Sequence, residues 1–160
     1  MRIKIFTAGG TIDKVYFDAK SEYLVGESNV GEILIEANVD LEYEAESILR
    51  KDSLDMTDAD RQLIFDRIQA DAHDHIVVTH GTDTIVETAV KLTAIQGKTI
   101  VLTGSMAPAR FKSSDAVFNI GFAVAAAQTL PHGAYIAING RIFDPRHVRK
   151  NRSLNRFEEI

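Results

Sequence analysis

The sequence contains no cysteine, and this absence removes several classes of chemistry. Without thiols, the 160-residue chain has no disulfide, no thiolate metal site and no cysteine nucleophile of the kind that many amidases use. Long apolar runs are also missing, since none approaches the ~20 residues that a membrane-spanning helix needs. Arg2 and Lys4 interrupt the first apolar segment. We therefore expect no signal peptide, no membrane association and a cytoplasmic location.

A strong excess of one charge is absent as well. The formal net charge of −5 does not suggest a nucleic-acid partner. Positive charge is nevertheless concentrated between Arg141 and Arg156, where six Arg or Lys residues accompany a single acid, Asp144. A solvated tail explains this cluster, and an anion-binding patch is the alternative. The length and the hydrophobic content of 45% favour one domain over residues 1–160, with no second domain.

Apolar segments alternate along the chain between strand-like and helix-like periods. The pattern predicts strands at 2–7, 42–49, 75–80, 99–103 and 134–138. It predicts helices that begin after Asn29, Thr57 and Thr84, and a fourth over 113–129. Residues 13–28 show no consistent period and are expected to form a long loop. The alternation predicts an α/β fold: a doubly wound, mostly parallel sheet with helices on both faces, a three-layer arrangement of flavodoxin or Rossmann type.

Small hydroxyl-bearing residues follow three of the predicted strands, at 9–11, 52–53 and 81–83. A parallel sheet brings such loops together at the carboxyl ends of its strands, where binding sites form. A threonine hydroxyl there becomes a nucleophile only if a base accepts its proton. In the central segment 76–84, Thr84 and Glu87 predict a capping box, which leaves Thr82 and Asp83 unexplained. A helix cap is the simpler interpretation of this segment, and binding an ammonium or polarising a carbonyl is the functional one.

Several familiar motifs are missing. The chain has no G-x-G-x-x-G and no G-x-x-x-x-G-K-[ST], which argues against a nucleotide site. The sequence around Ser105 lacks the second glycine of a serine elbow. His73, His75 and the acids of 52–60 could ligate a metal, but they lie where helix ends explain them. We expect no metal and no cofactor.

Five segments together resemble, in order and spacing, the amino-terminal domain of bacterial-type L-asparaginases. They are 8–12 (AGGTI), 53–56 (SLDM), 78–89 (VTHGTDTIVETA), 103–108 (TGSMAP) and 144–150 (DPRHVRK). The H-G-T-D-T-x-x-E-T-A block at 80–89 is the most specific of them. The resemblance implies hydrolysis of L-asparagine to L-aspartate and ammonia through a threonine acyl-enzyme, with weak glutaminase activity possible.

The same resemblance implies roles for individual residues. Thr11 matches the family nucleophile, and Tyr23 matches a lid tyrosine that hydrogen-bonds to it. The second triad would consist of Thr82, Asp83 and Lys150, with Lys150 as the proton acceptor. The substrate contacts implied are Gly10, Ser53, Leu54, Gly81, Thr82, Asp83 and Ser105. Among them, Asp83 would hold the α-ammonium, Ser53 the α-carboxylate and the Ser105 backbone the side-chain amide.

The chain also departs from the family pattern. Ala8 stands where a threonine is usual, and Glu22 replaces a neutral polar residue. Family enzymes are about twice as long and close each site with a second domain from a neighbouring subunit. We therefore expect a homodimer or a larger homo-oligomer, with the helix at 113–129 in the contact. Two alternatives stay open: a module that binds aspartate or asparagine without turnover, and the amidase part of a tRNA-linked amidotransferase.

Overall fold

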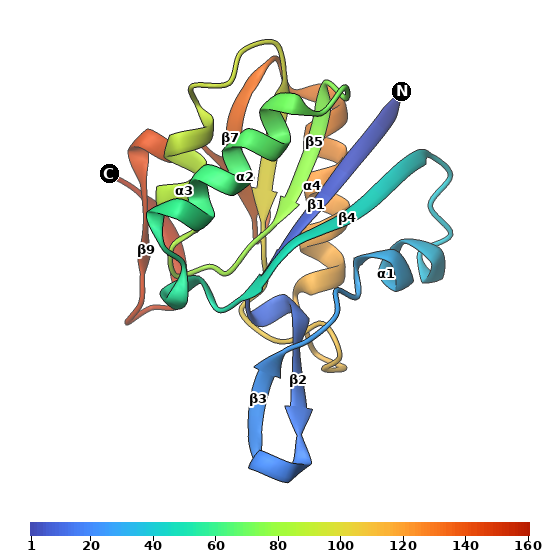
Figure 1. Cartoon of the computed structure of the whole chain (residues 1–160), viewed down its shortest axis with the longest axis vertical. Coiled ribbons are helices and arrows are strands. Elements are labelled where there is room, and N and C mark those ends of the chain that lie inside the picture. The colour runs from blue at the N-terminus through green and yellow to red at the C-terminus, as the bar shows by residue number, and fades with distance from the viewer.

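A six-stranded sheet in the order β4-β1-β5-β6-β7-β8 forms the centre of the computed structural model, which describes residues 1–160 (Figure 1). The first five strands in this order run parallel, and β8 pairs antiparallel with β7 at one edge. The bounds are β1 (Arg2–Gly9), β4 (Glu42–Lys51), β5 (His75–Thr79), β6 (Thr99–Thr103), β7 (Gly133–Ile138) and β8 (Arg141–Phe143). The predicted doubly wound, mostly parallel sheet is confirmed.

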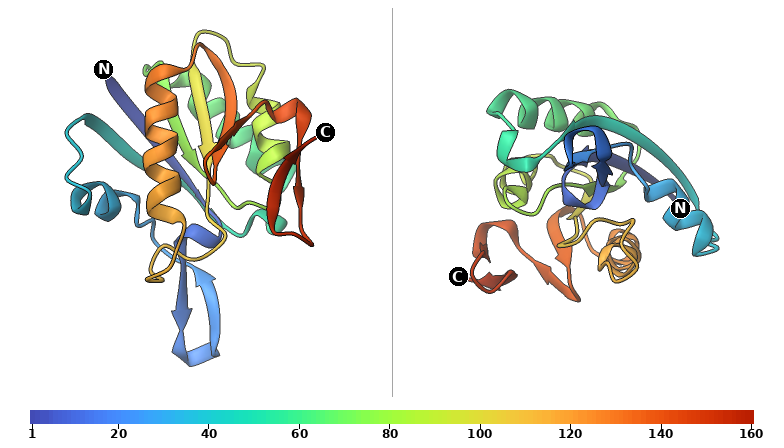
Figure 2. Two further views of the ribbon diagram at one scale, coloured as in Figure 1. Left: turned by 180° about the vertical axis from the view of Figure 1, so that it is seen from behind. Right: turned by 90° about the horizontal axis from the view of Figure 1, so that it is seen from below.

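Helices cover both faces of this sheet (Figure 2). On one face lie α2 (Asp58–Ala70) and α3 (Ile85–Leu92), and on the other lie α1 (Val30–Glu36) and α4 (Ala116–Thr129). Side chains of β5 alternate between the two cores: Ile76 and Val78 pack under α2 and α3, whereas Val77 packs under α1 and α4. The apolar run of this strand is thus explained by burial on both faces. None of the helices combines the length and the apolar character that spanning a membrane requires.

Of the predicted helix caps at Thr57 and Asn29, one forms in the structure and one does not. At α2, Thr57 accepts a hydrogen bond from the Asp60 N–H while the Asp60 carboxylate accepts one from Thr57, so this predicted cap is confirmed. At α1, Asn29 occupies the N-cap position, but its side chain makes no capping bond. Instead, the hydroxyl of Ser28 accepts a hydrogen bond from the Val30 N–H at 3.3 Å.

The loop predicted over residues 13–28 is wrong, because most of this segment forms a β-hairpin. Strand β2 (Lys14–Phe17) pairs antiparallel with β3 (Glu22–Val25), and the short helix η2 (Asp18–Lys20) connects them. The hairpin projects from the body of the molecule (Figure 1). Neither face of it is buried in the core, and Tyr16 and Tyr23 are 53% and 48% exposed. A strand without a buried face has no need of an alternating apolar pattern, which is why its sequence shows no period.

The chain after β8 folds into a second hairpin, which the sequence did not predict. The short helix η4 (Pro145–His147) leads into β9 (Val148–Asn151), which pairs antiparallel with β10 (Arg156–Glu159). Phe157 anchors the hairpin to the core, with its ring centroid 6.3 Å from that of Phe143. The basic cluster is therefore folded rather than a solvated tail. Four of its five arginines pair with acids, as Arg149 does with Glu158. The hydrogen bond from Arg146 holds the pKa of Asp144 well below its ordinary value.

Candidate active site

The predicted site residues gather where the strand order of the sheet reverses. Strands β1 and β5 are neighbours in the sheet, but the chain passes to α1 on one face after β1 and to α3 on the other face after β5. Gly10 and Thr11 follow β1, and Gly81 and Thr82 follow β5. Ser53 follows β4 and begins the short helix η3 (Ser53–Asp55). The carboxyl ends beside such a reversal are the usual location of ligand sites in open α/β sheets.

Glycines allow these loops to approach one another closely. A Cβ atom added to Gly10 would lie 2.4 Å from the Cα of Gly81, and one added to Gly81 would lie 2.6 Å from Oγ of Ser53. Gly10 also has φ 91° and ψ −174°, a backbone conformation that is essentially restricted to glycine. The two glycines therefore place Thr11, Thr82 and Ser53 beside one another.

We predict that Gly10→Ala lowers the free energy of unfolding by about 3 kcal/mol, because it combines backbone strain with a steric clash. Gly97→Ala is the matched control: Gly97 also has a positive φ of 76°, but nothing lies within 4 Å of an added Cβ. The control is expected to lose only about 1 kcal/mol. Urea unfolding measures both variants, and equal losses would show that the close approach to Gly81 carries no energetic weight.

Lys150, Thr82 and Asp83 form one hydrogen-bonded group. Lys150 extends from β9, and its Nζ donates to Oγ1 of Thr82 at 2.7 Å and to Oδ1 of Asp83 at 2.9 Å. The lysine side chain is only 12% exposed. Arg152 adds a weaker contact, with its Nε 3.5 Å from the same Asp83 oxygen. A lysine amine that is held against a hydroxyl and a carboxylate is placed to exchange a proton with that hydroxyl.

Ser53 is buried and linked to the loop after β5. Its Oγ accepts a hydrogen bond from the Thr84 N–H at 3.3 Å, and its carbonyl accepts one from the Thr84 hydroxyl at 2.8 Å. The predicted capping box of Thr84 with Glu87 is therefore wrong, since Thr84 makes no side-chain capping bond on α3. The neighbouring Leu54 is 60% exposed, so its side chain stands at the surface.

Thr11 and Tyr23 are not joined by a hydrogen bond. Thr11 is partly exposed at the start of the short helix η1 (Thr11–Asp13). Tyr23 lies on the projecting hairpin, where its ring packs against Tyr16 and Phe111 with centroids 5.4 and 5.7 Å apart. The structure thus brings together Thr82, Asp83 and Lys150 but leaves Tyr23 on an aromatic contact of its own.

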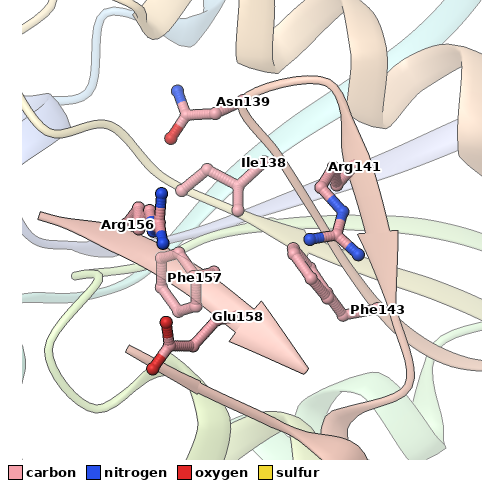
Figure 3. Close-up of a pocket in the computed structure, with 7 residues that line it drawn as sticks. All are labelled: Ile138, Asn139, Arg141, Phe143, Arg156, Phe157 and Glu158. Atoms are coloured by element: carbon pink, nitrogen blue, oxygen red, sulfur yellow. The ribbon is translucent and has the colours of Figure 1, made fainter. Parts of the chain in front are cut away.

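Two hollows border this region. One of about 590 Å³ lies between the hairpin and the end of β4, lined by Lys14, Tyr23, Leu24, Val25, Arg50, Lys51, Asp52 and Asp55. The other, of about 400 Å³, lies between β8 and β10 and is lined by Ile138, Asn139, Arg141, Phe143, Arg156, Phe157 and Glu158 (Figure 3). Neither hollow is lined by Thr11, Ser53 or Thr82, and the side chains of Ser53 and Thr82 are buried.

His80 begins the H-G-T-D-T motif, but the sequence alone assigns it no role of its own. Its ring is fully buried, with Nδ1 2.8 Å from the Gly81 carbonyl and Nε2 2.8 Å from the Thr88 hydroxyl. These contacts fit a neutral ring whose Nδ1–H donates to Gly81 and whose Nε2 accepts from Thr88. Burial lowers the pKa of His80 to about 4. The ring therefore stays neutral near pH 7 and ties the Gly81 turn to α3.

The pKa of Asp13, at the base of the β2–β3 hairpin, is shifted in the opposite direction to that of His80. Burial raises the pKa of its carboxyl to about 6 from 3.8, against the effect of hydrogen bonds with Ser28 and Asn29. For His80, the unfolded chain takes up a proton below its ordinary pKa of 6.5 while the native state does so only near 4. His80 therefore destabilises the fold as pH falls through that interval, whereas Asp13 stabilises it as pH falls from 6 toward 3.8.

We predict opposite pH dependences for variants of these two residues. Relative to the unsubstituted protein, His80→Gln gains about 3 kcal/mol of unfolding free energy between pH 7 and pH 4, because the penalty of the neutral histidine is removed. Asp13→Asn loses a similar amount, about 3 kcal/mol, over the same range. Urea unfolding at three pH values measures both, and parallel curves for all three proteins would contradict the assignment.

Comparison with known proteins places this arrangement in a family. The family model "Asparaginase, N-terminal" matches residues 2–158. The chain is 34% identical to L-asparaginase 2 of Escherichia coli, over 92% of this chain and 46% of that protein.

Two solved structures are similar at 29% identity each. The thermostable L-asparaginase from Thermococcus kodakarensis has a TM-score of 0.85, with 100% of this chain and 51% of that chain covered. L-asparaginase I from Vibrio cholerae has a TM-score of 0.84, with 99% and 51% covered. The chain thus spans about half the length of the relatives that it matches. It belongs to the asparaginase family and corresponds to the family's N-terminal domain.

Proposed function

We propose that the protein hydrolyses the side-chain amide of L-asparagine to give L-aspartate and ammonia. The observation that carries this proposal is the contact of Lys150 Nζ with the Thr82 hydroxyl at 2.7 Å, beside Asp83 and next to the loop of Thr11. Membership of the asparaginase family supports the choice of substrate. Free L-glutamine is the proposed weaker substrate, since one methylene is worth only about 1–3 kcal/mol of discrimination.

In the first half of the reaction, Oγ1 of Thr11 attacks the side-chain carbonyl carbon of asparagine. The carbon–nitrogen bond breaks, the hydroxyl proton leaves with the nitrogen as ammonia, and an aspartyl ester remains on Thr11. Asp83 binds the α-ammonium of the substrate, and Ser53 binds its α-carboxylate. The backbone of Ser105 accepts a hydrogen bond from the side-chain amide. These contacts fix the carbonyl carbon in reach of Thr11.

In the second half, a water molecule attacks the ester carbon. The Thr82 hydroxyl takes a proton from this water and passes its own proton to Lys150, which therefore acts in its neutral form. The carbon–oxygen bond to Thr11 breaks, aspartate is released, and Lys150 gives up the proton that it accepted, so that one proton returns to the Thr11 oxygen and the lysine is again neutral. Lys150 is suited to this role because it already contacts both Thr82 and Asp83.

A second candidate function is a module that binds aspartate or asparagine without turnover. The position of Tyr23 favours it, because the tyrosine packs on Tyr16 and Phe111 and not against Thr11. Ammonia release measured side by side with L-asparagine and L-glutamine separates the two functions. Release from asparagine supports the hydrolase, whereas calorimetric binding of aspartate with no ammonia would support the binding module.

We also propose that the protein assembles as a homodimer or a larger homo-oligomer through α4. One side of this helix is buried against the sheet, but Val117 and Phe118 are 53% and 59% exposed, and the Phe118 ring stacks on Phe122 at 6.0 Å. Contiguous exposed apolar surface of this kind is typical of a protein contact.

Light scattering is predicted to give a mass above the 17.7 kDa of one chain, and Phe118→Asp to reduce it to that of the monomer. Circular dichroism checks that the variant stays folded. A single-chain mass for the unsubstituted protein at micromolar concentration would contradict the contact.

A further inference from the structure

The loop that follows β6 is held in place by side chains from elsewhere in the chain. Asp115, which immediately precedes α4, accepts hydrogen bonds on Oδ1 from the N–H groups of Met106 at 3.0 Å and Ala107 at 3.2 Å. At this position an aspartate would ordinarily cap its own helix, yet Asp115 makes no capping bond to α4. The carboxylate is committed to the loop instead.

Two asparagines complete this network. Asn119 is fully buried, and its Nδ2 donates to the Gly104 carbonyl at 2.9 Å and to Oδ2 of Asp115 at 3.0 Å. Asn139, in the turn between β7 and β8, donates to the same Asp115 oxygen through Nδ2 at 2.9 Å. Its backbone N–H donates to Oδ1 of Asn119, also at 2.9 Å. With φ 49°, Asn139 adopts a left-handed conformation that asparagine tolerates better than most residues.

These bonds lie on both sides of Ser105. The carbonyl before it, on Gly104, is held by Asn119, and the N–H groups after it, on Met106 and Ala107, are held by Asp115. Ser105 is buried, its hydroxyl donates to the Ala107 carbonyl, and its own carbonyl accepts no hydrogen bond within the chain. These bonds fix the loop on both sides of Ser105 and leave the Ser105 carbonyl free to accept a hydrogen bond.

The loop after β6 packs closely against the loop that carries Thr82. A Cβ atom added to Gly104 would lie 2.3 Å from the His80 carbonyl oxygen and 3.2 Å from Cγ2 of Thr82. A displacement of Gly104 would therefore move the Ser105 carbonyl relative to the Thr82 hydroxyl. Such a displacement matters because misplacement of a contact by about 1 Å can lower a rate ~100-fold.

We infer that Asp115, Asn119 and Asn139 are positioning residues that aim the Ser105 carbonyl at the NH₂ group of the substrate's side-chain amide. The inference rests on the proposed function, in which this carbonyl contacts the amide. A carbonyl oxygen accepts hydrogen bonds from a carboxamide nitrogen and repels a carboxylate oxygen. The network therefore determines specificity: it favours a carboxamide ligand over the carboxylate that replaces it in the product.

The test compares L-asparagine with L-aspartate in Asp115→Asn. Asparagine has nearly the shape of aspartate, but an NH₂ group replaces one carboxylate oxygen. This NH₂ group would face the N–H donors that hydrogen-bond to the Asp115 carboxylate. We expect kcat/KM for asparagine to fall about 100-fold and its affinity to weaken, while the Kd for aspartate does not rise, because the Ser105 carbonyl gives no hydrogen bond to a carboxylate. Hydrogen exchange at the Met106 and Ala107 amides is expected to accelerate.

Two further variants separate positioning from general damage. Asn139→Gly keeps the left-handed backbone but removes the side-chain donor, and it should shift the affinity ratio of asparagine to aspartate in the same direction by a smaller factor. Thr57→Ala removes the cap of α2, whose bonds are to Asp60 and not to this network, and it should lower Tm without changing that ratio.

The inference is overturned if Asp115→Asn keeps the asparagine-to-aspartate affinity ratio of the unsubstituted protein, or if it loses both ligands in proportion to its loss of stability. Failure of the proposed function looks different, because the unsubstituted protein would then bind the ligands without releasing ammonia. In that case a changed affinity ratio together with faster exchange at Met106 and Ala107 would still support the positioning network.

Discussion

Thr11→Val is expected to lower the rate of ammonia release from L-asparagine about 10⁴-fold or more, the scale on which loss of a covalent nucleophile acts. Valine has nearly the shape of threonine, so the change removes the hydroxyl and little else. Because Thr11 is partly exposed and its hydroxyl has no hydrogen-bond partner within the chain, we expect the stability to change by less than ~0.5 kcal/mol. The loss of activity would then be due to the missing nucleophile and not to a loss of stability.

Thr11→Ser is the matched control for this prediction. Serine keeps a hydroxyl at the same position and should retain measurable turnover, and calorimetry should show that both variants bind aspartate. Ammonia release by Thr11→Val at the rate of the unsubstituted protein would rule Thr11 out as the nucleophile.

Lys150→Met should lower kcat for asparagine by about 10²- to 10⁴-fold, the usual contribution of a general acid or base. Methionine keeps the length of the side chain but cannot exchange a proton with Thr82, from which the Lys150 Nζ is now 2.7 Å away. It also leaves the Asp83 carboxylate with only the longer contact to Arg152 at 3.5 Å. Because Asp83 binds the α-ammonium of the substrate in the proposed reaction, weaker binding of asparagine should accompany the lower rate.

Arg149→Met is the control for the charge of this strand. Arg149 precedes Lys150 on β9 but pairs with Glu158 and does not contact Thr82. Steady-state kinetics should therefore leave this variant close to the unsubstituted protein. Equal losses in the two variants would mean that the basic charge of the hairpin, and not the Lys150 contact, supports activity.

The sequence was informative where burial imposes a pattern. The segment that begins at Ile76 is apolar because both faces of β5 are covered, and Thr57 with Asp60 forms a cap because every contact it needs is local. The projecting hairpin carries no such pattern, because its residues bury no face. Its strands could be recognised only from the pairing seen in the structure.

The errors at the site come from side-chain contacts between different elements, most of them far apart in sequence. Thr84 matches a local capping pattern, but the Ser53 carbonyl, 31 residues away in sequence, takes its hydroxyl instead. His80 was overlooked although Thr88 lies on the inner face of α3, where a buried polar side chain requires a partner. The meeting of Lys150 with Thr82 depends on a hairpin whose strands have no buried alternation, so only the family resemblance suggested it.

The central claim is that Thr11 carries the aspartyl group during turnover. The direct measurement is mass spectrometry of the protein, mixed with L-asparagine, quenched in acid within the turnover time and digested. The account predicts that the peptide containing Thr11 gains the mass of one aspartyl group, and that the adduct is absent in Thr11→Val. Ammonia release with no adduct on that peptide, or an adduct that survives in Thr11→Val, would contradict it.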